Sequence, residues 1–175
     1  MLAGSSELRA AVDVREHDPM SRLPVDRIRA ATAADADQLL RLWALLFDEN
    51  TTDSLTRWKE YAREWFASCV ENPTVARFPV VEVAGDLVAT AIGTLEVGVP
   101  NPQCPRGRSV RLANVITVSE HRAQGHGTLL VRDVIEWARS IHADRVDLSA
   151  TPDGQHIYVR AGFDLTSAPR MKLVL

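Results

Sequence analysis

The sequence is poor in residues on which several classes of protein depend. It has only two cysteines, Cys69 and Cys104, and their separation matches no metal-site spacing. We expect both to be reduced thiols in a cytoplasmic protein. Cys104 is expected at an exposed position in a loop. Positive charge is not in excess, since the net charge is −3, which argues against nucleic-acid binding. No apolar run has the length of a membrane span, and the first residues lack the basic-then-apolar pattern of a secretion signal.

What is present fits an ordinary globular domain. The chain has 175 residues, of which 46% are hydrophobic and 25% are charged, and this is enough for one domain with a proper core. Residues 1–24 carry mixed charge without sustained periodicity, and we expect a flexible extension there. Residues 25–175 are expected to form a single domain without internal repeats.

Apolar periodicity predicts a strand and a helix at the beginning of that domain. Asp26–Ala31 favours a short strand. Thr32 and Asp35 have the spacing of a capping box, which predicts a helix from that point to about Asp48. Five apolar residues recur at helical spacing and are expected to form its buried face: Leu39, Leu42, Trp43, Leu46 and Phe47.

A second helix is predicted from Asp53 to about Val70, and it carries an aromatic stripe. The stripe, which is either core packing or part of a substrate pocket, consists of Trp58, Tyr61, Trp65 and Phe66. Two β-branched runs, 78–84 and 87–97, flank Gly85-Asp86 and predict an antiparallel hairpin. Residues 99–108 include three prolines and must form a loop; it either covers a site or is a solvated connection.

The second half of the chain alternates strands and helices. Val110–Val118 favours a strand. It is followed by a helix with one apolar face, formed by Leu130, Val134, Trp137, Ala138 and Ile141. Asp144–Ala150 should be a strand parallel to the first, because a helix connects the two. A short helix over Asp153–Ala161 can end at Gly162, and residues 163–166 and 171–175 suit a final hairpin.

The most informative stretch is Arg122-Ala-Gln-Gly-His-Gly-Thr128, which lies between a predicted strand and a predicted helix. Glycines at positions 125 and 127 permit a tight turn and a close approach of the backbone to a ligand. The first N–H groups of a helix have no partner inside the helix and form a site for an anion. The segment therefore predicts a cradle for a phosphate-bearing molecule.

Two common phosphate motifs do not fit this stretch. A dinucleotide fingerprint requires a third glycine where this chain has Leu130, and a Walker A loop requires a lysine after the glycine. The segment Arg122–Gly127 instead resembles the acyl-CoA loop of the GNAT acetyltransferase superfamily, whose pattern is Arg/Gln-x-x-Gly-x-Gly/Ala. Ile157-Tyr158-Val-Arg-Ala-Gly162-Phe163 is similar to a second signature of that family, aliphatic-Tyr-x-x-x-Gly-Phe.

The resemblance implies a mixed α/β (α+β) fold. Its central sheet would be mixed but mostly antiparallel, with about six or seven strands, splayed between the family's fourth and fifth strands and flanked by about four helices. It also implies an acetyl-CoA-dependent N-acetyltransferase that moves an acetyl group directly to a primary amine within a ternary complex. The acceptor would be a small molecule or a peptide, no metal would be needed, and a homodimer is left open.

The resemblance also assigns roles to residues. Those expected to bind acetyl-CoA are Ile116, Thr117, Val118, Arg122, Gln124, Gly125, His126, Gly127 and Thr128. Arg122 would either pair with a phosphate or brace the turn, and His126 would be a solvent-exposed loop residue rather than a catalyst. Tyr158 would be the general acid, because a phenol near pKa 10 stays protonated at neutral pH and can donate to a leaving thiolate. Candidates for acceptor contact are Asn114, Glu120, Trp58 and Tyr61, with Trp65 beside them.

The sequence departs from the family at two positions. Some members use a glutamate on the fourth strand as the base, where this chain has Arg111 and Asn114; Glu120 and His121 could relay a proton through water or be solvated. Thr151 stands where many members have an asparagine that contacts pantetheine. A non-catalytic acyl-CoA-binding module therefore stays open as an alternative, and a nucleotide-binding protein is a third.

Overall fold

A six-stranded sheet forms the centre of the computed structural model, which describes residues 28–47, 55–167 and 171–174. Five strands follow the order β1, β3, β4, β5, β6, and β2 pairs with β4 off this path. Their bounds are β1 Ile28–Ala30, β2 Ala76–Arg77, β3 Pro79–Val83, β4 Asp86–Val97, β5 Arg108–Thr117 and β6 Arg145–Asp147. All pairings are antiparallel except that of β5 with β6.

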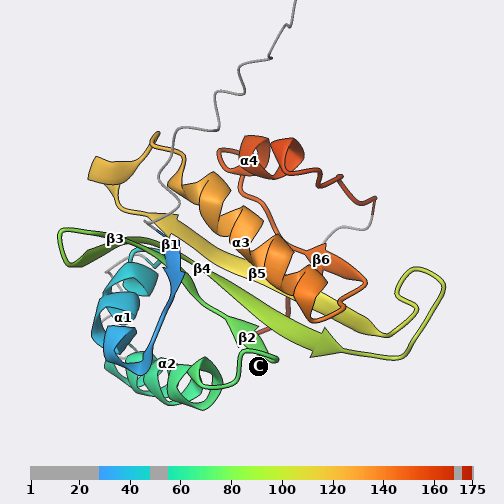
Figure 1. Ribbon diagram of the computed structural model, residues 1–175, viewed down its shortest axis with the longest axis horizontal. Coiled ribbons are helices and arrows are strands. Elements are labelled where there is room, and N and C mark those ends of the chain that lie inside the picture. Colours follow the sequence, from blue (N-terminus) through green and yellow to red (C-terminus); the bar gives the residue numbers. More distant parts are fainter. Residues whose placement is uncertain (1–27, 48–54, 168–170, 175) are drawn as a thin grey trace, which may run out of the picture.

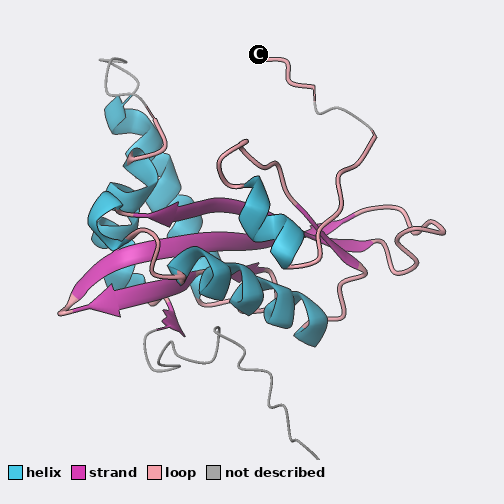
Figure 2. Cartoon of the chain, turned by 90° about the horizontal axis from the view of Figure 1, so that it is seen from above, coloured by secondary structure: helices cyan, strands magenta, loops and turns pink. Residues whose placement is uncertain are grey.

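Helices cover both faces of this sheet (Figures 1 and 2). One face carries α1 (Ala36–Ala44) and α2 (Leu55–Val70), and the other carries α3 (His126–Ser140) and α4 (Gln155–Arg160). The predicted mixed α/β fold, mostly antiparallel and with four helices, is thus confirmed. No helix in the described ranges is long and apolar enough to cross a bilayer.

Two apolar cores lie on the two faces, and the alternation of side chains along the strands creates them. In β3, Val80 belongs to the core under α1 and α2, whereas Val81 belongs to the core under α3. Both side chains are fully buried. A one-residue slip would exchange the two sets, so the register of the sheet is strongly specified.

The hairpin of β3 and β4 is confirmed where the sequence predicts it. Val83 pairs with Asp86, which leaves a two-residue loop of Ala84 and Gly85. Both loop residues have positive φ, 53° and 91°, as a type I′ turn requires. The glycine therefore supplies a conformation that other residues seldom adopt.

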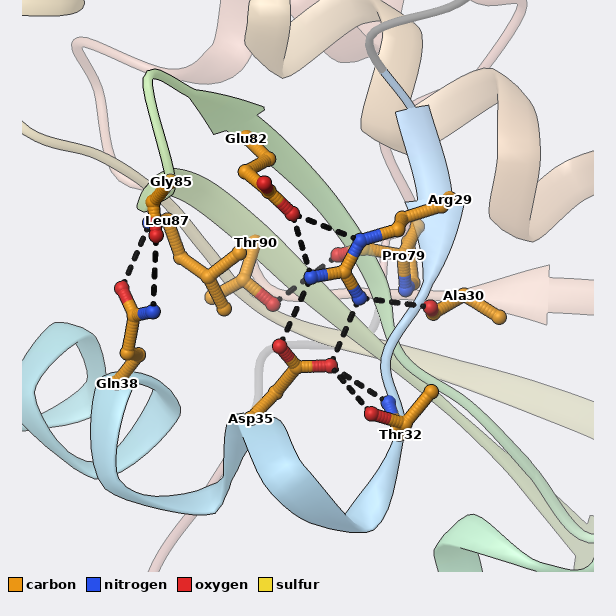
Figure 3. A network of polar contacts seen from close by, with 10 residues as sticks. All are labelled: Arg29, Ala30, Thr32, Asp35, Gln38, Pro79, Glu82, Gly85, Leu87 and Thr90. Atoms are coloured by element: carbon orange, nitrogen blue, oxygen red, sulfur yellow. Dashed lines mark hydrogen bonds and ion pairs between the residues drawn. The ribbon is translucent and has the colours of Figure 1, made fainter.

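A charged network fixes the beginning of α1 against this hairpin (Figure 3). The Arg29 guanidinium donates to both oxygens of Asp35, at 2.7 and 2.9 Å, and to Glu82 at 2.7 Å. Asp35 also accepts the backbone N–H of Thr32 at 2.7 Å, which agrees with the predicted capping residues. The Arg29 side chain lowers the pKa of Asp35 to about 2. One turn later, Gln38 accepts the backbone N–H of Leu87 at 2.8 Å.

The buried face of α1 differs in part from the prediction. Leu39, Leu42 and Trp43 are buried as expected, but Leu46 and Phe47 are exposed. The helix ends at Ala44, and Leu45 to Phe47 follow as turns. Helical spacing no longer assigns side chains to one face once the helix has ended. Asp48, the last residue of the predicted helix, lies outside the described part of the chain. So do residues 53 and 54, where the second helix is predicted to begin.

Helix α3 is held to the sheet by close packing and by two polar contacts. A Cβ on Gly93 of β4 would lie 2.8 Å from Val134 Cγ1, so only glycine fits at this contact. Arg77 and Asp133 form a bidentate ion pair with N–O distances of 2.7 and 2.8 Å. The Trp137 indole N–H donates to the Pro73 carbonyl at 2.6 Å.

The loop before β5 is packed, and Cys104 is buried rather than exposed, contrary to the sequence-based expectation. Its thiol donates to Asp144 Oδ2 at 3.3 Å, and the Arg106 backbone N–H donates to the same oxygen at 2.7 Å. Burial raises the pKa of this thiol, and the neighbouring carboxylate adds to the effect. The loop joins the beginning of β5, so it lies at the opposite end of that strand from the glycine-rich turn.

The predicted final hairpin is wrong for the residues that the structure describes. Residues 163–167 and 171–174 form no strand, and their large apolar side chains Leu165 and Leu173 are exposed. β6 spans three residues instead of the predicted seven. A segment of strand-like composition forms a strand only where a neighbouring strand can pair with it, and β6, at this edge of the sheet, is only three residues long. The predicted extension over residues 1–24 and the first residues of the strand predicted from Asp26 lie outside the described ranges.

Candidate functional site

The site begins at an irregularity in β5. Thr90 pairs with Ile116 and Ile92 with Ala113, so two residues of β5, Asn114 and Val115, lie opposite one residue of β4. Asn114 has a φ of 49°, which identifies a β-bulge with its first residue in the left-handed region. Asparagine tolerates this region better than most residues. The bulge redirects the last residues of the strand.

Beyond the bulge, β5 separates from β6. The two strands pair only through Ser109, Val110 and Arg111 with residues 145–147. The last residues of β5 therefore have no pairing with β6, which agrees with the predicted splay. Unpaired N–H and C=O groups along such an edge can bind the amides of an extended ligand as an added strand would.

The glycine-rich turn follows this open edge. Ala123 and Gly125 have positive φ, 58° and 83°, and α3 begins at His126 with Gly125 as the residue before it. An added Cβ on Gly127 would lie 3.3 Å from Ile157 Cδ1 of α4. The second glycine thus permits a close approach of α4 to the first turn of α3. The strand, turn and helix predicted from the sequence are all present here.

A pocket of about 640 Å³ joins these elements. It is lined by the turn after α1 (Leu45, Leu46), the end of β5 (Val115, Ile116, Thr117), the glycine-rich turn and first residues of α3 (His121, Arg122, Ala123, Gly125, His126, Gly127, Thr128) and α4 (His156, Ile157, Arg160). This is the volume of a typical small-molecule site.

The described lining of this pocket contains arginine and histidine but neither aspartate nor glutamate. Arg122 and Arg160 supply fixed positive charge, and the first turn of α3 adds the partial charge of a helix N-terminus. Arg122 Nε donates to the Thr117 carbonyl at 3.2 Å, so this side chain braces the turn as well as lining the pocket. No group of His, Cys, Asp or Glu in the described residues could hold a metal ion.

His126 is buried, contrary to the expectation of an exposed loop residue. Its side chain is 1% exposed, and its ring centroid lies 6.4 Å from that of His121. The expectation rested on the resemblance, because the family tolerates many side chains at this position. In the structure, His126 is the first residue of α3, and its buried side chain lines the pocket.

Tyr158 lies on α4 but lines a different pocket. It contributes to a cavity of about 170 Å³ on the β6 side of α4, which Asp147 and Phe163 also line. Its ring makes an edge-to-face contact with Phe163 at 6.0 Å between centroids. Burial raises the pKa of this phenol. Gly162 ends α4 with a φ of 93°, and the Phe163 N–H donates to the Tyr158 carbonyl at 3.0 Å, as in a Schellman motif.

Comparison with family models gives a match over residues 39–163 to the acetyltransferase (GNAT) family. The chain belongs to this family. A search of curated proteins finds no match. The GNAT match includes the bulged strand, the glycine-rich turn and the Tyr158 helix, so the predicted resemblance is confirmed.

Solved structures show the same GNAT fold. A crystal structure of a predicted acetyltransferase with acetyl-CoA from Clostridium acetobutylicum has a TM-score of 0.73 and 19% identity, covering 84% of this chain and 94% of that one. Glucosamine-6-phosphate N-acetyltransferase from Arabidopsis thaliana has a TM-score of 0.69 and 17% identity, covering 84% and 97%. A GCN5-related N-acetyltransferase from Ralstonia eutropha has a TM-score of 0.71 and 21% identity, covering 83% and 97%.

Most residues predicted to bind acetyl-CoA in this GNAT chain lie together around the larger pocket. Two do not line it: the Val118 N–H donates to Val88 within the sheet at 2.9 Å, and Gln124 is exposed. Sequence reasoning gave no site role to seven lining residues: Leu45, Leu46, Val115, Ala123, His156, Ile157 and Arg160. The signal for three of them was present, since they flank Tyr158 in the second GNAT signature.

The four candidates for acceptor contact are not brought together. Asn114 forms the bulge, and Trp58 contacts Phe47 edge-to-face at 5.4 Å between centroids. Tyr61 is exposed on α2, and Glu120 is exposed before the turn. A hydrogen bond from its own backbone N–H, together with one from Ser119, lowers the pKa of Glu120. This carboxylate is therefore a weak base and does not line the pocket.

Proposed function

We propose that this chain transfers an acetyl group from acetyl-CoA to a primary amine of a small molecule or peptide, by direct attack in a ternary complex. The observation that carries the proposal is the pocket of about 640 Å³, in which the glycine-rich turn, two arginines and the open edge of β5 meet. The GNAT match and the neighbour with acetyl-CoA support the identity of the donor.

The chemistry of the lining fits the donor along its length. Backbone N–H groups at Gly127 and Thr128, with Arg122 and Arg160, suit the phosphates. The open edge of β5 suits the amides of the pantetheine arm. Because β5 runs toward the turn, the arm would extend back along the strand and bring the thioester to the bulge at Asn114. A backbone N–H there would stabilise the developing oxyanion, and one such donor contributes about 3 kcal/mol.

In the proposed step, the lone pair of the neutral amine forms a bond to the thioester carbonyl carbon. The C–S bond then breaks and the sulfur leaves with the electron pair. The amine nitrogen loses one proton and the sulfur gains one, so the products are an acetamide and CoA thiol. Neither cysteine lines the pocket, and the proposal includes no acyl-enzyme.

Tyr158 is proposed as the general acid that protonates the sulfur. Its raised pKa keeps the phenol protonated at neutral pH. Since it lines the cavity on the β6 side of α4, the thioester would have to reach the gap between β5 and β6. The splay beyond Arg111 leaves that route unobstructed by strand pairing.

One observation favours a second candidate function. No carboxylate among the described lining residues could accept the proton of an ammonium group. A non-catalytic acyl-CoA-binding module would need no such base, so this absence favours it. Under the first proposal, His121, which lines the pocket, or a water molecule would take this proton, because an imidazole ring nitrogen can accept one. A cytoplasmic location remains part of the proposal and agrees with two free thiols. Whether the chain forms a homodimer is left to a measurement of mass in solution.

Calorimetric titration with acetyl-CoA, with ATP and NAD as controls, tests the proposal. Gly127→Glu places a negative charge and a side chain at the phosphate cradle, without a positive φ to strain it. Gly98→Glu is the matched control, because a Cβ on Gly98 would meet nothing within 4 Å. We expect selective acetyl-CoA binding that Gly127→Glu abolishes and Gly98→Glu keeps. Folded protein without acetyl-CoA binding would contradict both candidate functions, and binding without thiol release for any amine would favour the second.

A further inference from the structure

The residues that follow α1 form an apolar, solvent-exposed wall of the pocket. Leu45 is 63% exposed and Leu46 is 45% exposed, yet both line the pocket. Val115 and Ile116 line the same pocket from β5. Large exposed apolar groups that gather at a pocket mark a surface that binds a partner or ligand.

This apolar wall continues onto α2 through an aromatic pair. Phe47 follows Leu46 directly and is exposed. Its ring contacts Trp58 edge-to-face at 5.4 Å between centroids, and Trp58 is itself partly buried against the core. Leu45, Leu46, Phe47 and Trp58, which we call the apolar wall, are thus linked by one ring contact and by their adjacency in the chain after α1.

Two residues of the apolar wall, Leu45 and Leu46, share the pocket with the residues proposed to bind the donor. Arg122 and Arg160 line the pocket from the turn and from α4, where a phosphate would bind. Val115 is the second residue of the bulge, where the proposed function places the thioester. The attacking nitrogen must come within about 3.5 Å of the acyl carbon, so the remainder of the acceptor has to lie near Val115, in the pocket that Leu45 and Leu46 also line.

We propose that the acceptor is a monoamine carried on an apolar body, aryl or alkyl, and that the apolar wall binds this body. The inference rests on the proposed acetyl transfer and specifies its substrate class. In the step, the nitrogen bonds to the acetyl carbon, the C–S bond breaks, the amine loses a proton and the sulfur gains one. The apolar body takes no part in the chemistry and determines how tightly the amine is held.

An amine series with saturating acetyl-CoA tests the inference by thiol release. The amines are propylamine, butylamine, pentylamine and hexylamine, with 2-phenylethylamine as the aryl member. 2-(2-Aminoethoxy)ethanol matches hexylamine in length without its apolar character, and spermidine supplies additional positive charge. Burial of a methylene group increases kcat/KM by about fourfold. We therefore expect this rise at each step of the alkyl series, chiefly through KM, with little turnover of the polar amine and of spermidine.

Leu46→Asn is the variant, because the side chain is exposed and its loss leaves no cavity in the core. Val97→Asn is the matched control: Val97 is exposed as well, but it pairs with Arg108 at the opposite end of β5. In Leu46→Asn, assayed with saturating acetyl-CoA, we expect kcat/KM for hexylamine to fall by about tenfold. The control should match the unmodified protein with every amine.

The outcomes separate this inference from the proposed function. Equal use of hexylamine and its polar analogue, preference for spermidine, or unchanged hexylamine kinetics in Leu46→Asn would overturn the inference alone. A change in the mass of the protein in solution on Leu46→Asn, without a change in amine selectivity, would overturn it as well, since a second copy would then cover the apolar wall. Failure to bind acetyl-CoA in the calorimetric titration would overturn the proposed function and this inference together.

Discussion

Replacing Asp35 by asparagine should destabilise the protein by an amount that depends on pH in a defined way. Asp35 is nearly buried, with a side chain that is 9% exposed, and it accepts both Nη groups of Arg29. The asparagine side chain would keep one acceptor oxygen but lose the charge, and it would leave the guanidinium with only Glu82 as a charged partner. The beginning of α1, which this network fixes to β3, would lose its anchor.

The magnitude follows from the pKa of Asp35, which falls from 3.8 to about 2 on folding. One pKa unit corresponds to about 1.4 kcal/mol, so the ionised carboxylate contributes about 2 kcal/mol to the free energy of unfolding at neutral pH. Because the folded pKa is depressed, this contribution is complete above about pH 4 and disappears as the pH falls through about 2. By about pH 3 roughly half of it should remain.

Urea denaturation of the unmodified protein and of Asp35→Asn between pH 7 and pH 3 measures this difference. Glu82→Gln is the control, because Glu82 contacts the same guanidinium but is 41% exposed, and an exposed pair contributes less than about 1 kcal/mol. A loss below about 0.5 kcal/mol in Asp35→Asn would refute the reasoning. So would a difference that stays constant down to about pH 3, because the effect would then not come from ionisation.

Three further predictions concern the site and its scaffold. Tyr158→Phe should lower kcat by about a hundredfold with acetyl-CoA affinity unchanged, and unchanged turnover would contradict its role as general acid. Because burial raises the pKa of this phenol, the activity of the unmodified protein should persist beyond about pH 10 before loss of the tyrosine proton limits it. Arg160→Gln should weaken acetyl-CoA binding by about tenfold in calorimetry, and less at high salt, whereas Arg139→Gln on the exposed side of α3 should not. Gly93→Ala should lower the free energy of unfolding by about 1–3 kcal/mol in urea denaturation, because the new Cβ would lie 2.8 Å from Val134 Cγ1. An unchanged free energy of unfolding would mean that α3 can move away from β4.

The sequence predicted the elements whose signal is local. The hairpin, the strand before the turn and the apolar face of α3 follow from periodicity and from turn residues, and all are confirmed, with the hairpin loop at Ala84-Gly85 instead of the predicted Gly85-Asp86. The glycine-rich turn was also predictable, because a backbone of positive φ next to a helix requires particular residues. These features depend on neighbours within a few positions in the chain.

Features that depend on distant residues were not predictable. Cys104 is buried because Asp144, forty positions later, accepts from its thiol. Leu46 has the spacing of a buried residue, but α1 ends before it, so it lines the pocket instead. The side of α4 that faces the pocket carries His156 and Arg160, and the packing of α4 against α3 and the core, including Ile157 beside Gly127, gives it this orientation.

The two polar contacts that hold α3 have a consequence for how the chain folds. Arg77 is 56 positions from Asp133, and Pro73 is 64 positions from Trp137. During synthesis the hairpin of β3 and β4 can close early, but its face toward α3 stays exposed until the helix has emerged. At about 5–20 residues per second, the roughly fifty residues from Val88 to Ala138 take about 3–10 s. Contacts of such long sequence separation also slow folding. For those seconds the uncovered apolar face is open to aggregation, and the pocket forms only when that interval ends.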